Sequence, residues 1–177
     1  MRFVLVLLLV VPWLSLFWLD KQTIKRYMPV TIFTALLMTI IFQIAYTFKW
    51  WTIHQSIVPW GYMIDVSFAY GIFTVGTLWI FVLTYRKFWI YLLTNVAMDA
   101  IFAFVVFPLL DKTGVATLHK ISAWQYFLVI LAISLLIYGY QAWQEPIFAA
   151  PGNERKKFRM FGDMPEKGFM SRRQKAE

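Results

Sequence analysis

Two polar residues four positions apart lie inside the long apolar run 92–111, and they are the first candidates for chemistry. Asn95 and Asp99 share one face of a helix at that spacing, and Tyr91 extends the face by one turn. A carboxylate at mid-membrane costs about 2.5–3.5 kcal/mol on insertion scales. A chain that keeps such a residue has a use for it, so Asp99 is the centre of the predicted site.

A second acid and an amide lie in neighbouring apolar runs. Asp65 and Gln43 are predicted at about the same depth, where they could hydrogen-bond, with Asp99 about 6 Å deeper. As a functional site, these residues would form a polar pathway that suits proton-coupled transport. As a structural feature, Asp99 would hydrogen-bond to Asn95, Tyr91 or a neighbouring helix and join the spans.

Five apolar runs must position these residues. The chain has 177 residues, of which 60% are hydrophobic. Each run approaches the ~20 residues needed to cross a bilayer, where backbone groups must be satisfied within a helix. The sequence predicts an all-α integral membrane bundle of five transmembrane helices, at 3–19, 28–48, about 60–83, 88–110 and about 123–143.

Basic residues alternate between the loops and predict the orientation. Most of the 17 Lys and Arg residues lie between runs 1 and 2, between runs 3 and 4, and after run 5. The positive-inside rule then places the N-terminus outside and the C-terminus in the cytoplasm. This pattern predicts a multi-pass protein of the cell membrane.

Small residues on the third run predict close helix packing. Ser67 and Gly71 share one face with small-xxx-small spacing, and Gly76 lies on the opposite face with Asp65. Two such faces predict a central helix that is contacted on both sides.

The remaining ionisable residues indicate no cofactor. His54, His119 and Asp111 fall in predicted outer loops and are the weak candidates for a metal site, because they lack ligand spacing. The chain has no cysteine, which excludes thiolate ligands and cysteine nucleophiles. The sequence also lacks phosphate-binding and nucleophile-elbow motifs. We expect no metal and no cofactor.

The composition becomes polar and basic near the C-terminus. We predict a membrane domain over 1–145 and a mobile cytoplasmic tail over 146–177. Basic residues at the start of the tail are expected to bind anionic lipid headgroups rather than nucleic acid: Arg155, Lys156, Lys157 and Arg159.

Three short segments carry a family resemblance: Lys49-Trp50-Trp51, Asn95-x-x-x-Asp99 and Phe107-Pro108-Leu109-Leu110-Asp111. Through them the chain resembles an uncharacterised family of small multi-span membrane proteins from endospore-forming Gram-positive bacteria. The resemblance covers most of the five runs and implies a bacterial cytoplasmic membrane. It implies no activity and no catalytic residue.

Three functions fit these observations. The first is a non-enzymatic accessory or structural membrane protein, acting in a complex with a membrane-protein partner or as a homo-oligomer. The second is a small transporter or ion pathway that uses Asp99 and Asp65. The third is a membrane enzyme acting on a lipid or isoprenoid, with the same acids in acid–base roles. Tight packing around a capped Asp99 would favour the first function, a water-lined cavity the second and a lipid-facing groove the third.

Overall fold

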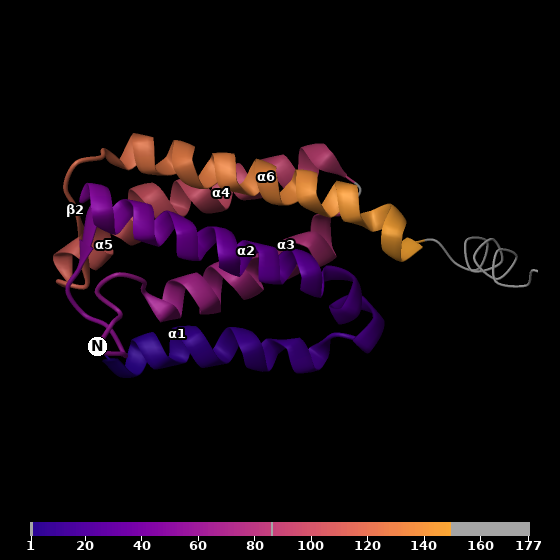
Figure 1. Cartoon of the computed structure of the whole chain (residues 1–177), viewed down its shortest axis with the longest axis horizontal. Helices are drawn as coiled ribbons and strands as arrows, with labels where there is room; N and C mark the ends of the chain where they lie inside the picture. The colour runs from indigo at the N-terminus through magenta and orange to yellow at the C-terminus, as the bar shows by residue number, and fades with distance from the viewer. Residues whose placement is uncertain (1, 86, 150–177) are drawn as a thin grey trace, which may run out of the picture. The chain divides into compact units, whose positions relative to one another are not determined.

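A computed structural model describes residues 2–85 and 87–149, and the fold is all-α (Figure 1). The chain divides after Trp143 into two units, and the described part of the second unit is 144–149. In chain order the helical segments are α1 (Arg2–Ser15), η1 (Leu16–Trp18), α2 (Lys21–Phe48), η2 (Phe68–Phe73), α3 (Thr74–Thr84), α4 (Phe88–Ile101), η3 (Phe102–Val106), α5 (Phe107–Lys112) and α6 (Ala123–Ala149).

Three helical stretches of the described chain are long and apolar enough to cross a membrane. They are Lys21–Phe48, Phe88–Lys112 and Ala123–Pro146, which correspond to the second, fourth and fifth predicted runs. Two shorter apolar helices, Arg2–Trp18 and Phe68–Thr84, correspond to the first and third. Large apolar side chains on these helices are exposed, among them Phe3, Ile32, Leu83, Leu93 and Leu136. Such a surface is compatible with a membrane protein.

The third helix starts later than predicted. The predicted run begins near Trp60, but 57–64 form turns, with Gly61 N donating to Val58 O and Met63 N to Trp60 O. Asp65 then ends the loop by accepting hydrogen bonds from the first amides of the helix. Proline and glycine in this stretch favour turns over helix, so apolar composition overstated the length of the span.

A short antiparallel ribbon joins two loops that are distant in sequence. β1 (Trp51–Ile53) follows α2, and β2 (Ala116–Leu118) follows α5, with Thr52 opposite Thr117. The helix prediction did not include these strands. The ribbon holds the two predicted outer loops together, so the C-terminal ends of α2 and α5 lie at the same end of the bundle.

The segment formed by η2 and α3 is central in the first unit. It contacts α1, α2 and α4. Two tryptophan indole groups form hydrogen bonds between this segment and α1. Trp13 Nε1 donates to Tyr70 O at 2.8 Å, and Trp79 Nε1 donates to Ser15 Oγ at 2.8 Å. These contacts hold the shorter N-terminal helix against the centre of the bundle.

The helix α6 continues through Pro146 to Ala149. The predicted boundary between 145 and 146 therefore falls inside this helix. The predicted headgroup-binding residues Arg155, Lys156, Lys157 and Arg159 lie outside the described residues.

Candidate functional site

Asp99 lines a cavity of about 340 Å³ between α3, α4 and α6. The walls are mainly apolar, and Met38 of α2 completes them. Their principal aliphatic residues are Ile72, Ile80, Leu83, Ile130, Ile133 and Ile137. Most of the polar lining comes from α4, which contributes Tyr91, Thr94, Asn95 and Asp99 on one side of the space. We call this space the Asp99 cavity.

The Asp99 carboxyl group has no hydrogen-bond partner among the described residues for its buried Oδ2. The two neighbours predicted to bind it are engaged elsewhere. The Tyr91 hydroxyl donates to the carbonyl oxygen of Ser134 at 2.7 Å, and Asn95 Nδ2 donates to the carbonyl oxygen of Tyr91 at 2.8 Å. The bonds by which Asn95 or Tyr91 would cap Asp99 are therefore not formed, and the tight packing around a capped Asp99 that would favour a purely structural role is not observed. Tyr91 itself joins α4 to α6.

Asp65 occupies a different place and has a structural role. Its Oδ1 accepts hydrogen bonds from Ser67 N at 2.8 Å and Phe68 N at 3.3 Å. An aspartate in this position caps the helix that follows, because it satisfies amides that have no partner inside the helix. The predicted bond to Gln43 is not formed, since Gln43 is exposed on α2. The structure thus does not bring these two residues together.

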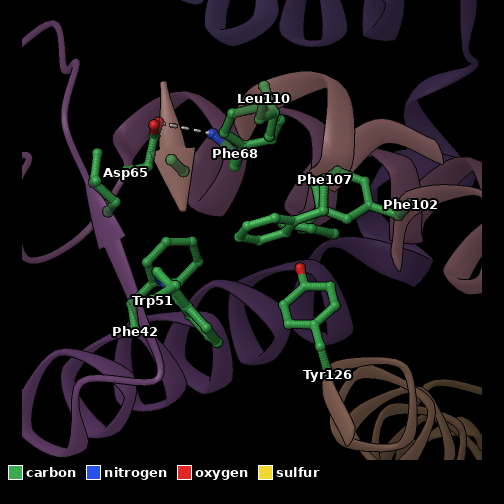
Figure 2. A pocket seen from close by; sticks show the side chains of 11 residues that line it. Phe42, Trp51, Asp65, Phe68, Phe102, Phe107, Leu110 and Tyr126 are labelled. Carbon is green, nitrogen blue, oxygen red and sulfur yellow. Dashed lines mark hydrogen bonds between the residues drawn. The ribbon is translucent and has the colours of Figure 1, made fainter. Parts of the chain in front are cut away.

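A small aromatic pocket surrounds the Asp65 carboxyl group, and we call it the Asp65 pocket. Figure 2 shows Asp65 at one side and the rings of Phe42, Trp51, Phe68, Phe102, Phe107 and Tyr126 around the space. Tyr126 is almost fully buried on α6, and its hydroxyl points into the pocket toward Phe107 (Figure 2). The volume of about 30 Å³ is enough for a water molecule.

The Asp99 cavity and the Asp65 pocket adjoin each other at an aromatic partition. Both are lined by Phe73 and Phe102, whose ring centroids are 4.9 Å apart. These rings belong to η2 and η3, which are the two π-helical segments of the described chain. Short π segments within α-helices are frequent at functional sites. The two predicted site acids therefore line neighbouring spaces and not one shared site.

The predicted packing residues differ in their surroundings. Gly71 lies against the α1 backbone, where an added Cβ would overlap the carbonyl oxygen of Leu8 and lie 2.9 Å from Leu9 Cα. Ser67 is fully buried. Gly76 lines the Asp99 cavity, and an added Cβ there would meet nothing within 4 Å. Close packing at Gly76 is therefore not observed, because its face borders open space.

The weak metal candidates do not form a cluster. His54 Nε2 lies 3.2 Å from Thr117 Oγ1, and that hydroxyl donates to Asp111 Oδ1 at 2.8 Å. Thr117 thus bridges His54 and Asp111, whereas His119 lines a separate cleft beside the ribbon. Within 2–85 and 87–149, no three His, Cys, Asp or Glu side chains are grouped to hold a metal ion.

No protein-family model, curated protein or solved structure matches this chain.

Sequence reasoning missed the contribution of α6 to both spaces. Tyr126, Ser134 and the isoleucines of α6 resemble any other apolar span in composition. Between Tyr126 and Ile137 this helix has no charged residue and Ser134 is its one polar aliphatic residue, so the packing and not the sequence identifies the face that lines the two spaces.

Proposed function

We propose that this chain is a non-enzymatic, multi-span membrane protein that binds an amphiphilic ligand in the Asp99 cavity. The observation that carries the proposal is the buried Asp99 Oδ2, which has no partner among residues 2–85 and 87–149 and lies in a cavity with mainly aliphatic walls. A buried acceptor without a partner is unfavourable, so a ligand that donates to it gains binding energy. The matching ligand has an apolar chain and a head group that carries a positive charge or a hydrogen-bond donor.

The membrane frame of this proposal is five spans, with the N-terminus outside and the C-terminus in the cytoplasm. The two shorter apolar helices, Arg2–Trp18 and Phe68–Thr84, would supply the first and third spans beside the three longer ones. At 1.5 Å per residue each is about 25 Å long, which local thinning of the bilayer could accommodate. We further propose the bacterial cytoplasmic membrane as its location, on the family resemblance.

A complex or homo-oligomer is part of the same proposal. A lone five-span chain is small for a transporter that works by alternating access, because such transporters usually contain internal repeats. A second copy or a partner protein would supply the missing spans. Binding of the basic tail to anionic headgroups would add anchoring at the cytoplasmic face.

A second candidate function is a proton or ion pathway. It is supported by the adjoining Asp65 pocket and Asp99 cavity, which share Phe73 and Phe102. Conduction would require these rings to move, because they lie between the two acids. Acid–base catalysis by Asp65 and Asp99 has less support, because Asp65 is engaged as a helix cap.

Photo-crosslinking tests the ligand proposal. The probes are dodecylamine, dodecanol and dodecyl sulfate, each with a diazirine in the chain, added to the purified full-length protein in nanodiscs. We expect the amine to label the aliphatic wall, mapped by mass spectrometry, and Asp99→Asn to weaken this labelling about 10–100-fold. That range corresponds to the loss of a charge-assisted hydrogen bond.

The matched control is Asp65→Asn, which removes the other buried acid from the neighbouring pocket. We expect amine labelling of the Asp99 cavity to be unchanged in this variant. Equal labelling by the amine and the sulfate, or amine labelling that is insensitive to Asp99→Asn, would overturn the proposal. Proton flux into liposomes that Asp99→Asn abolishes would instead support the pathway.

A further inference from the structure

A third space, separate from the Asp99 cavity, lies beside the ribbon. We call it the ribbon cleft; it has a volume of about 860 Å³. Its basic residues are Lys49, His119 and Lys120, and its aromatic walls include Tyr46, Trp51 and Tyr62. No aspartate or glutamate of the described chain lines it. The cleft is thus positively charged, with apolar rings next to the charge.

The register of the ribbon brings these basic residues together from two loops. Beyond the paired strands, His119 N donates to Trp50 O at 2.8 Å, and Lys120 N donates to Lys49 O at 3.3 Å. Lys49 and Lys120 are therefore neighbours across the chain pair. Like charges that face each other across strands are destabilising, so this pairing favours an anion between them.

Lys49 also has an unusual backbone. Its φ of 55° makes it the one non-glycine residue with positive φ in the described chain. This position follows the last turn of α2, where glycine or asparagine is usual. A lysine there benefits from the helix dipole. The dipole does not explain His119 and Lys120, which come from the other loop, so a site for an anion explains the set better.

The two acids near the cleft are already engaged: Asp65, whose pocket shares Trp51 and Ile53 with the cleft, caps a helix, and Asp111 of the neighbouring loop binds a threonine. Asp111 accepts a hydrogen bond from Thr117, which also contacts His54, and Asp111 does not line the cleft. The exposed residue Thr52 adds a hydroxyl to the lining. Two ammonium groups, an imidazole and a hydroxyl are donors that suit a tetrahedral oxyanion.

We propose that the ribbon cleft binds a phosphate group, presented by a lipid headgroup or by free phosphate. The lysines and His119 bind its oxygens, and the aromatic rings of Tyr46 and Tyr62 contact the apolar part of an attached molecule. This proposal does not rest on the amphiphile in the Asp99 cavity, because the two spaces share no lining residue.

Native mass spectrometry and thermal shift test the proposal on the full chain in dodecylmaltoside without phosphate buffer. The probes are phosphatidylglycerol, diacylglycerol as the phosphate-free lipid, and inorganic phosphate. We expect phosphatidylglycerol to bind and diacylglycerol not to bind. Competition by inorganic phosphate identifies a site for the phosphate group alone. If inorganic phosphate does not compete, the site recognises the phosphodiester of a lipid.

The deciding variant is Lys49→Asn with Lys120→Gln, because asparagine tolerates positive φ. We expect it to weaken phosphate-dependent binding at least about tenfold, from the loss of charge-assisted hydrogen bonds. Lys25→Gln with Lys112→Gln removes the same charge elsewhere and should leave binding unchanged. If the double variant fails to fold, the single Lys120→Gln variant replaces it, because Lys120 is exposed and its substitution should not disturb the fold. This single variant should also weaken phosphate-dependent binding. Equal losses in the cleft and control variants, or no loss in either, would overturn the proposal.

Discussion

Asp65 is buried and Asp99 is half-buried, and their carboxyl groups have opposite hydrogen-bonding states. Asp65 Oδ1 accepts hydrogen bonds from the backbone amides of Ser67 and Phe68, in the first turn of the helix that Asp65 caps. Asp99 Oδ2 is buried beside a cavity and has no hydrogen-bond partner within the part of the chain that the structure describes. The same residue type is therefore structural at one position and available to a ligand at the other.

Two glycines of the central helix make a matched pair for a stability prediction. Gly71→Ala should destabilise the protein by about 1–3 kcal/mol, because its Cβ would press on the α1 backbone at Leu8 and Leu9. Gly76→Ala should be neutral or stabilising by up to about 1 kcal/mol, because the space is open and alanine favours helix. Reversible unfolding in mixed micelles, followed by tryptophan fluorescence, measures both. If both substitutions lowered the free energy of unfolding equally, the contact of Gly71 with α1 would not account for the loss.

At the scale of the element, α2 and the helix that follows Asp65 begin where a carboxylate accepts hydrogen bonds from backbone amides. Thr74 Oγ1 donates to Ala69 O at 2.6 Å, which satisfies a carbonyl group within the π-helical region of η2. Tyr91 performs a related task between helices, since its hydroxyl binds the Ser134 carbonyl group of α6. The Tyr91 bond joins two residues that line the Asp99 cavity, and neither bond involves Asp99.

The start of α2 yields a prediction about pH. Asp20 Oδ2 accepts hydrogen bonds from Gln22 N at 3.1 Å and Thr23 N at 2.9 Å. Hydrogen bonds from Thr23, joined by that from Gln22, hold the pKa of Asp20 below its ordinary value. Stability from this cap is therefore present above the ordinary pKa and is lost as the pH falls through the lowered one.

We expect the amides of Gln22 and Thr23 to lose protection as the pH falls below about 4, the ordinary pKa of an aspartate, because the pKa of Asp20 lies lower still. Hydrogen exchange, corrected for intrinsic rates, measures this loss. Asp20→Asn keeps an acceptor at every pH and should remove the pH dependence. A similar pH dependence in Asp20→Asn would show that another group is responsible.

At the scale of the whole molecule, the ribbon and the alternating loops bear on topology. β1 and β2 join the loops after α2 and α5, so both loops belong on one side of any membrane that the helices cross. The proposed orientation places this ribbon outside, opposite the basic loop that begins α2. The ribbon cleft would then face the outer surface.

Cysteine labelling tests this topology cleanly, because the chain contains no cysteine. We expect an impermeant maleimide to label Gln55→Cys and Thr113→Cys on intact cells. Gln22→Cys and Ala176→Cys should react only after the membrane is permeabilised. Labelling of Gln22→Cys on intact cells would reverse the orientation. If Gln55→Cys and Thr113→Cys were labelled from opposite sides of the membrane, the two loops could not form one ribbon.

The sequence alone predicted the helical class and the location of the apolar helices. These properties depend on composition along the chain, because a long apolar run becomes helical wherever water is absent. Asn95 and Asp99 were also predicted to line one helical face, which follows from helix geometry. The five-span count and the orientation stay predictions until the labelling is done.

Only the tertiary structure decided what each polar residue contacts. Asp65 caps a helix and does not bind Gln43. Asn95 and Tyr91 donate to backbone carbonyl groups and do not bind Asp99. The ribbon and the wall that α6 contributes were not predicted either. The physical reason is that such contacts depend on where each helix starts and how it is rotated against its neighbours. Hydropathy does not encode either quantity, because many rotations and offsets bury the same apolar surface.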